Sequence, residues 1–254
     1  MSSQEIFEEA RSYFGEAGFN LFVKIKSDEY DRVTVSKKSS SDFVRGAKSI
    51  LLSGFAGNTF WTVFNRFLID NPDFKEKHED LIDSYTTLKF SRVSEVLGAE
   101  RGISYKAVFP FGSGALDMDF VNLGMLGGVG VPSLLGILLH PKYGTWISLR
   151  GALITNLEFE EYDEPLVSFE PCPACPKPCI TACPAHTVSD RGWDWESCMR
   201  FRISSETCSG KCASRLACPY GKEHAYTEEQ SAYHHGFVLK SVKDYFKKRG
   251  DDYL

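Results

Sequence analysis

The first 171 residues of this 254-residue chain contain no cysteine. All eight cysteines lie between Cys172 and Cys218, so any chemistry of the thiols belongs to one short segment. A secreted protein held together by disulfides would spread its cysteines over the fold, and this chain also shows no apolar signal segment. We therefore expect reduced thiols and a cytoplasmic protein rather than a disulfide framework.

Long apolar runs and an excess of positive charge are also missing. The apolar run at 134–140 ends in a His-Pro pair and is much shorter than the roughly 20 residues that span a bilayer. The chain has 29 Lys and Arg against 34 Asp and Glu, with a net charge of -5, whereas a nucleic-acid surface needs clustered basic side chains. We expect neither a membrane nor a nucleic acid as partner.

The spacing of the cysteines predicts two iron–sulfur clusters. The order is Cys172-x2-Cys175-x3-Cys179-x3-Cys183-Pro184, then Cys198, then Cys208-x3-Cys212-x5-Cys218-Pro219. Each 4Fe-4S cluster takes four thiolates, and runs that end in Cys-Pro are typical of ferredoxins. Eight thiolates therefore supply two clusters with none left over.

In two-cluster ferredoxins the cysteine before the proline binds the other cluster. The same exchange here predicts one ligand set of Cys172, Cys175, Cys179 and Cys218, and a second set of Cys183, Cys198, Cys208 and Cys212. Structural zinc is the alternative, since Cys-x2-Cys also occurs in zinc sites, although these usually contain two separated Cys-x2-Cys pairs.

We expect Trp193 and Trp195 to shield the clusters, and His234-His235 to have a surface or packing role.

Helical and strand patterns alternate along the cysteine-free part and predict an α/β (α+β) fold. We expect an opening helix capped by Ser2 and Glu5, a helix at 60–71 that Pro72 ends, a long helix at 74–97 and a carboxy-terminal helix at 228–246. Strands are expected at 47–55, 104–109, 134–140, 145–150 and 152–159, the last three as neighbours in a central sheet. The glycine-rich stretch 112–130 lacks the strand-to-helix context of a nucleotide loop, because Pro132 interrupts it.

These patterns predict a first domain at 1–164, ended by the acidic linker 158–165, and a cysteine domain at 165–225. The last segment, 226–254, is expected to pack back on the first domain.

The run Leu139-His-Pro-Lys-Tyr-Gly-Thr-Trp-Ile-Ser-Leu-Arg-Gly151 resembles a motif of two groups of cobalamin proteins. One is the CblC family of cobalamin-processing proteins, and the other comprises the epoxyqueuosine reductases and reductive dehalogenases. Both build a cobalamin pocket on a flavin-nitroreductase-like fold. The resemblance implies that Gly136, Ile137, Leu138 and His140 line the corrin, and that Arg150 matches an arginine that binds glutathione in CblC relatives.

Other stretches divide between the two groups. Asp194-Trp195 and the run at 228–233 resemble CblC, whereas two clusters with an isolated cysteine, as Cys198 stands here, resemble the reductases. The chain departs from epoxyqueuosine reductases because 109–114 contains no acidic proton donor and a later Gly-Lys-Asn is absent. Dehalogenases are longer and carry an export signal.

The sequence therefore suggests a CblC-like cobalamin reductase, which reduces cobalamin or removes its upper ligand, with its own ferredoxin-like two-cluster segment. A ferredoxin or flavodoxin would supply electrons, and the cobalamin would bind base-off without a histidine ligand. Two alternatives stay open: a cobalamin-dependent reductase of an organic substrate, and an iron–sulfur electron-transfer protein whose α/β layer binds flavin or nothing. No catalytic residue is assigned.

Overall fold

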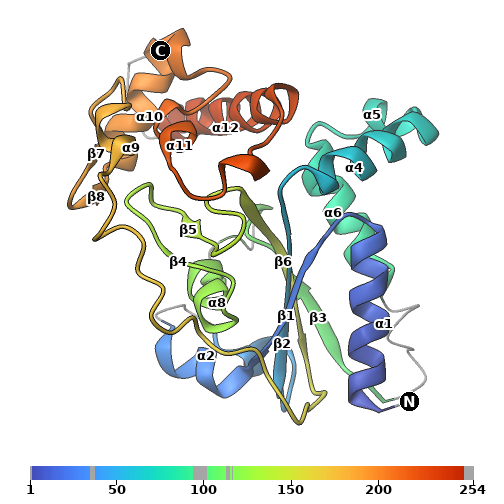
Figure 1. Cartoon of the computed structure of the whole chain (residues 1–254). Helices are drawn as coiled ribbons and strands as arrows, with labels where there is room; N and C mark the ends of the chain where they lie inside the picture. Colours follow the sequence, from blue (N-terminus) through green and yellow to red (C-terminus); the bar gives the residue numbers. More distant parts are fainter. Residues whose placement is uncertain (1, 35–37, 94–101, 113–114, 116, 249–254) are drawn as a thin grey trace. The chain divides into compact units, whose positions relative to one another are not determined.

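The protein is described by a computed structural model covering residues 2–34, 38–93, 102–112, 115 and 117–248. It has the mixed α/β architecture expected from the sequence and divides into two compact units (Figure 1). The first unit contains residues 1–131 and 147–167, and the second contains 132–146 and 168–254. The second unit is thus assembled from two separate stretches of the chain.

The described residues of the first unit form the following helices and strands. They are α1 (Ser3–Glu16), β1 (Leu21–Lys26), α2 (Ser27–Val33), α3 (Ser40–Phe43), β2 (Ser49–Ala56), α4 (Thr59–Asp70), α5 (Asp73–Lys77), α6 (Leu81–Ser91), β3 (Tyr105–Val108), α8 (Phe120–Leu126) and β6 (Ile147–Thr155). The strands form one antiparallel sheet in the order β1-β2-β6-β3. Every residue of the central strand β2 is buried, which explains its unbroken apolar run.

Helices cover both faces of this sheet (Figure 1). On one face Ile50 and Leu52 of β2 pack with Tyr30 from α2 and Leu123 from α8. The other face is aromatic, since stacked and edge-on rings link residues of α1, α4 and α6, among them Phe14, Phe60, Tyr85 and Phe90. Many phenylalanines of this unit are therefore core residues, and burying them stabilises the unit.

Several expected elements are confirmed. Ser2 and Glu5 form the capping box of α1, a strand and a helix lie on either side of Gly57-Asn58, and α4 ends before Pro72. The long helix expected at 74–97 is instead two helices, α5 and α6, separated at 78–80, where Asp80 caps α6. The end of that expected helix, at 94–97, lies outside the described residues, as do 113–114 and 116 of the glycine-rich stretch.

The expected central strands at 134–140, 145–150 and 152–159 are wrong in two respects. The last two are one continuous strand, β6, because Gly151 lets the strand pass close to Phe90 without interruption. The stretch 134–140 is not in the main sheet, since only β5 (Leu138–Leu139) is extended there, paired with β4 (Val131–Pro132).

The second unit contains short elements around the cysteines and one long helix, α12. They are α9 (Pro178–Thr181), β7 (Val188–Ser189), β8 (Gly192–Trp193), α10 (Trp195–Ser204), η3 (Glu206–Cys208), α11 (Ala213–Ala217), η4 (Lys222–His224) and α12 (Glu228–Lys248). α9 contacts α11, and α12 contacts α10. The loop 140–144 belongs here because Gly144 lies against the backbone of Tyr220 and Gly221.

The units differ from the expected domains of 1–164, 165–225 and 226–254. Residues 132–146 group with the cysteine segment, and α12 is part of that same unit. The expected packing of the carboxy-terminal helix on the first domain stays a prediction. No helix in the described part of the chain has the length and apolar character that crossing a membrane requires.

Candidate functional site

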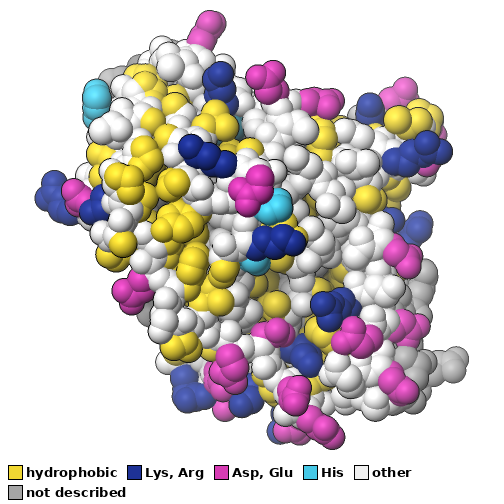
Figure 2. All heavy atoms as spheres, in the orientation of Figure 1, with side chains coloured by type: hydrophobic (Ala, Val, Ile, Leu, Met, Phe, Trp, Pro, Cys, Tyr) yellow, Lys and Arg dark blue, Asp and Glu magenta, His cyan; other side chains and the backbone are white. Residues whose placement is uncertain are grey.

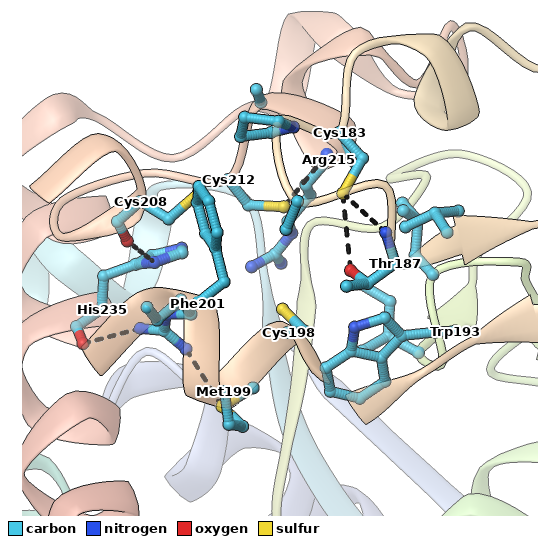
Figure 3. Close-up of a pocket in the computed structure, with 18 of the residues that line it drawn as sticks. Cys183, Thr187, Trp193, Cys198, Met199, Phe201, Cys208, Cys212, Arg215 and His235 are labelled. Atoms are coloured by element: carbon cyan, nitrogen blue, oxygen red, sulfur yellow. Dashed lines mark hydrogen bonds between the residues drawn. The ribbon is translucent and has the colours of Figure 1, made fainter. Parts of the chain in front are cut away.

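Four cysteines surround a cavity of about 280 Å³ in the second unit, and we call them the second cysteine site. They are Cys183, Cys198, Cys208 and Cys212. Cys183 follows α9, Cys198 lies in α10, Cys208 ends η3, and Cys212 precedes α11. Their side chains come from separate segments and face a common space (Figure 3).

The other four cysteines line a smaller cavity of about 20 Å³ and form the first cysteine site. They are Cys172, Cys175, Cys179 and Cys218. Leu135 lines both cavities, so the two sites share a wall. The eight cysteines therefore divide into the two groups that the crossed spacing predicts. That each group binds a cluster stays a proposal.

Local hydrogen bonds hold several sulfurs in place. The backbone N–H groups of Lys177, Thr187 and Arg215 donate to the sulfurs of Cys175, Cys183 and Cys212, each at 3.4 Å. The Asp194 side chain caps α10 by accepting from the Ser197 N–H, and this fixes the helix that carries Cys198. Such donors stabilise a thiolate or a cluster sulfur.

The thiol pKa values differ among the cysteines. Burial raises the pKa of Cys179, Cys208, Cys212 and Cys218, and neighbouring cysteines add to this for Cys179 and Cys208. Burial also raises the pKa of Cys183, but hydrogen bonds with the backbone N–H and the hydroxyl of Thr187 oppose it, and the value falls to about 7. Metal binding would therefore release protons from most of these thiols.

The donor set fits an iron–sulfur cluster. All eight cysteines are free thiols, and each site has two buried and two partly exposed sulfurs. Among the described residues, no three His, Cys, Asp or Glu side chains lie close enough for one metal ion; a four-iron cluster instead needs its thiolates spread around a cavity. The buried Nε of Arg202, without a hydrogen-bond partner, belongs to a side chain lining the second cavity.

The residues expected to line a corrin lie beside these sites. Ile137 lines the second cavity. Gly136 has a left-handed φ of 71°. A Cβ at this position would overlap the Trp193 ring, so the group that the Gly136 backbone approaches closely in the structure is this tryptophan. Leu138 is buried in β5.

His140 is held within its turn. Its Nδ1 accepts hydrogen bonds from the N–H groups of Lys142 and Tyr143, at 2.9 and 3.2 Å. Burial, together with the nearby Lys142, lowers the pKa of His140 to about 4, so the ring is neutral at pH 7. The role of His140 seen in the structure is therefore to accept hydrogen bonds from the backbone of its own turn.

Arg150 is not grouped with the other expected contacts. It lies on β6 in the first unit, where its guanidinium pairs with Asp83 of α6 and stacks on Phe111 at 5.0 Å. The ion pair forms between these two elements because α6 packs against β6.

The two tryptophans differ in position. Trp193 lines the second cavity, as expected of a shielding residue, whereas Trp195 is 42% exposed and packs on Tyr245 and Phe246. His234 and His235 both line the cavity, and His235 Nδ1 lies 3.3 Å from the Cys208 carbonyl oxygen.

The sequence analysis missed Arg202 and Arg215, which line the same cavity. Their positions among the cysteines, four residues after Cys198 and three after Cys212, were the available signal.

Charge on the molecular surface is mixed. On the face drawn in Figure 2, basic side chains stand singly among acidic ones rather than in one patch. This agrees with the acidic balance of the sequence, and the expected absence of a nucleic-acid partner stays a prediction.

No protein-family model matches the chain, and no curated protein matches it by sequence. Solved structures do match. An epoxyqueuosine reductase solved with a modified tRNA-Tyr stem loop has a TM-score of 0.61 at 15% identity, over 91% of this chain and 69% of that one. The C. elegans B12-trafficking protein CblC has a TM-score of 0.60 at 15% identity, over 94% and 96%.

The reductive dehalogenase NpRdhA has a TM-score of 0.51 at 14% identity, covering 91% of this chain, which spans only 34% of that protein. These are the three groups that the motif at 139–151 resembles, so the expectation of a relationship at the level of fold is confirmed. The chain thus has the α/β fold that epoxyqueuosine reductase, CblC and reductive dehalogenase share.

Proposed function

We propose that this protein is an iron–sulfur, cobalamin-binding reductase that reduces cobalamin or removes its upper ligand. The observation that carries the proposal is the division of the eight cysteines into two groups of four, each lining its own cavity. The first cysteine site would hold one 4Fe-4S cluster and the second cysteine site the other. Bound clusters of this type transfer single electrons over a wide range of potentials.

The position of the 132–146 stretch supports a cobalamin site near the clusters. This stretch contains the residues that the family resemblance assigns to the corrin, and it belongs to the same unit as all eight cysteines. Its residues Leu135 and Ile137 line the cysteine cavities. A corrin bound there would be close to its source of electrons.

The chain's own residues would do three things in this function. The cysteines hold the clusters, and Trp193 covers the wall of the second cavity with an apolar ring. Neutral His140 supports its turn through Nδ1. Arg150, in its ion pair with Asp83, would need to leave that carboxylate before it could bind an anionic thiol cosubstrate.

The test is anaerobic reconstitution with iron and sulfide, followed by titration with cyanocobalamin and absorption spectra before and after a low-potential reductant. We expect iron and sulfide for two clusters per chain and a shift of the cobalamin to a reduced, base-off spectrum. Clusters without any cobalamin response would indicate an electron-transfer protein, with flavin the next ligand to test. Bound zinc without iron would overturn the proposal.

A turnover experiment distinguishes the proposed reaction from the remaining alternative, a cobalamin-dependent reductase of an organic substrate. A ligand-removing reductase converts cyanocobalamin to reduced cobalamin, and the cobalamin is the product. A cobalamin-dependent reductase of an organic substrate retains its cobalamin over many cycles. Release of the processed cobalamin after a single reduction would support the proposed reaction, and retention through repeated reduction of an added organic substrate would contradict it.

A further inference from the structure

Arg202 is a buried cation in the wall of the second cysteine site. It lies in α10 one turn after Cys198, and the residue is only 8% exposed. Its guanidinium donates to the His235 carbonyl oxygen at 2.9 Å and to the Met199 sulfur at 3.7 Å. Both partners are neutral, and the Arg202 Nε has no partner.

The charge of Arg202 is not balanced by a carboxylate. No ion pair with Asp or Glu is found for it in the described part of the chain, and no acidic side chain lines the cavity. An arginine stays protonated in proteins, and a buried charge is costly unless an opposite charge is near. Cys198, Cys208 and Cys212 line the same cavity as Arg202, so thiolates or a cluster held by these cysteines are the negative charge available to it.

Arg215 adds a second positive charge to the same cavity. Its guanidinium donates to the Thr145 carbonyl oxygen at 2.5 Å and stacks on Trp146 at 4.4 Å, and its Nε also lacks a partner. Arg202 and Arg215 both line the cavity of the second cysteine site, so both charges act on one small region. Two like charges here increase the need for an anion.

The first cysteine site has a different surrounding charge. The basic residue in its wall is Lys177, whose ammonium is paired with Asp190 at 2.5 Å. That pair is partly exposed, so solvent screens it. A buried, unbalanced cation is thus present at the second site, while the basic group at the first site is neutralised.

We infer that Arg202 is the counterion of an anionic cluster in the second cysteine site and holds the reduction potential of that cluster above that of the cluster in the first site. The inference rests on the proposed pair of clusters and not on cobalamin. Reduction adds one electron to a cluster that already carries negative charge, with no bond made or broken. A fixed positive charge therefore stabilises the reduced form more than the oxidised one.

The test compares Arg202→Gln and Arg202→Lys with the wild-type chain after reconstitution with iron and sulfide. Glutamine removes the charge but can still donate to the His235 carbonyl, and lysine keeps the charge. The matched control is Arg200→Gln, in the same helix, because Arg200 pairs with Glu196 and does not line the cavity. Midpoint potentials are measured by titration with dithionite, followed by electron paramagnetic resonance.

We expect R202Q to shift the equilibrium of one cluster toward its oxidised form by about tenfold or more, which is 59 mV for a one-electron couple. The other cluster should not shift, R202K should keep at least half of the wild-type difference, and R200Q should move neither potential. Unchanged potentials in R202Q, or an equal shift of both clusters, would overturn the inference.

Loss of a cluster is also informative. If R202Q loses the iron of one cluster and R202K retains it, the charge is needed to hold the anion and the inference stands. If both variants lose it, shape rather than charge is required and the inference is wrong. Failure of the wild-type chain to take up iron would refute the proposed clusters instead, and failure to bind cobalamin would leave this inference unaffected.

Discussion

Gly136 illustrates how a single residue carries two interpretations. The motif resemblance places it against a corrin, while the structure places the Trp193 ring where its side chain would be. Either neighbour, the corrin or the Trp193 ring, would leave no space for a side chain at position 136. The two interpretations differ in what a substitution would disturb first, because the contact with Trp193 exists in the folded protein without any ligand.

We expect Gly136→Ala to destabilise the protein by roughly 2–4 kcal/mol, from a left-handed φ combined with overlap on a packed ring. Gly46→Ala is the matched control, since Gly46 has a similar φ of 73° but open space around it, and should lose only about 1–2 kcal/mol. Denaturant unfolding measures both. Equal losses would show that the ring contact contributes nothing.

The spacing of the cysteines predicted how they divide into two groups. Each of the two runs ends in a Cys-Pro pair, and the cysteine of that pair is assigned to the other group. The roles of Arg202 and Arg215 were not predicted, since their spacing from the cysteines is a weak signal that the neighbouring Arg200 also shares. Arg202 lines the cavity, whereas Arg200 pairs with Glu196. That difference depends on how α10 is rotated in the fold.

Helix α6 begins at a carboxyl group with an unusual protonation state. Asp80 caps the helix by accepting from the Asp83 N–H at 3.0 Å. Burial raises the pKa of Asp80 to about 7, Asp83 adds to the shift, and Arg150 opposes it. In the unfolded chain this carboxyl has its ordinary pKa of 3.8. The folded state therefore binds more protons between these two values, and its stability falls as pH rises through that window.

Asp80→Asn should flatten this dependence. Asparagine remains a good cap acceptor and cannot ionise, so the variant should lose less stability than the wild type between pH 4 and pH 8. Thermal unfolding at several pH values measures the slopes. The control is Asp73→Asn, an exposed aspartate of α5, which should retain the wild-type slope. Parallel curves for Asp80→Asn and wild type would contradict the assignment.

Helix α10 depends on its own cap. The Asp194 carboxylate accepts from the Ser197 N–H at 3.1 Å and from the Ser197 hydroxyl at 2.6 Å. Removing it should destabilise the first turn of the helix that carries Cys198, because an amino-terminal N–H then loses its acceptor. We expect Asp194→Ala to lose iron from one cluster faster than wild type under a chelator, while Asp194→Asn behaves nearly as wild type. Identical iron loss in both variants would show that the cap does not position Cys198.

Elements with a complete local signal were predictable from the sequence, among them α1 with its capping box and α4 with a glycine before it and a proline after it. The stretch 134–140 was not, because an apolar run of that length suits a strand or a loop packed on other residues. Here Leu134 and Leu135 pack against Cys179 and Cys183. The run is apolar because it lines the cysteine sites.

At the scale of the whole molecule, the two units have different sources of stability. The first unit has a four-stranded sheet with an apolar core on one face and stacked aromatic rings on the other. The second unit has several short helices and the long helix α12 around two cavities. In small domains of this kind, bound metal contributes much of the folding free energy.

Chelation of iron from the reconstituted protein should therefore affect the units unequally. We expect hydrogen exchange to increase strongly in α10 and α11 and to change little in β2 and β6. Mass spectrometry of peptides from each element, with and without chelator, measures this. A uniform increase across both units would indicate that they unfold together.

The grouping of sulfurs also sets the order in which the sites can be completed as the chain is synthesised. The second cysteine site has all its ligands once Cys212 has left the ribosome, whereas the first, although it begins at Cys172, waits for Cys218. A chain that stops between these two positions would have one full set and three cysteines of the other. Under the proposed assignment, a cluster in the first site would be completed only after the whole cysteine segment had been synthesised.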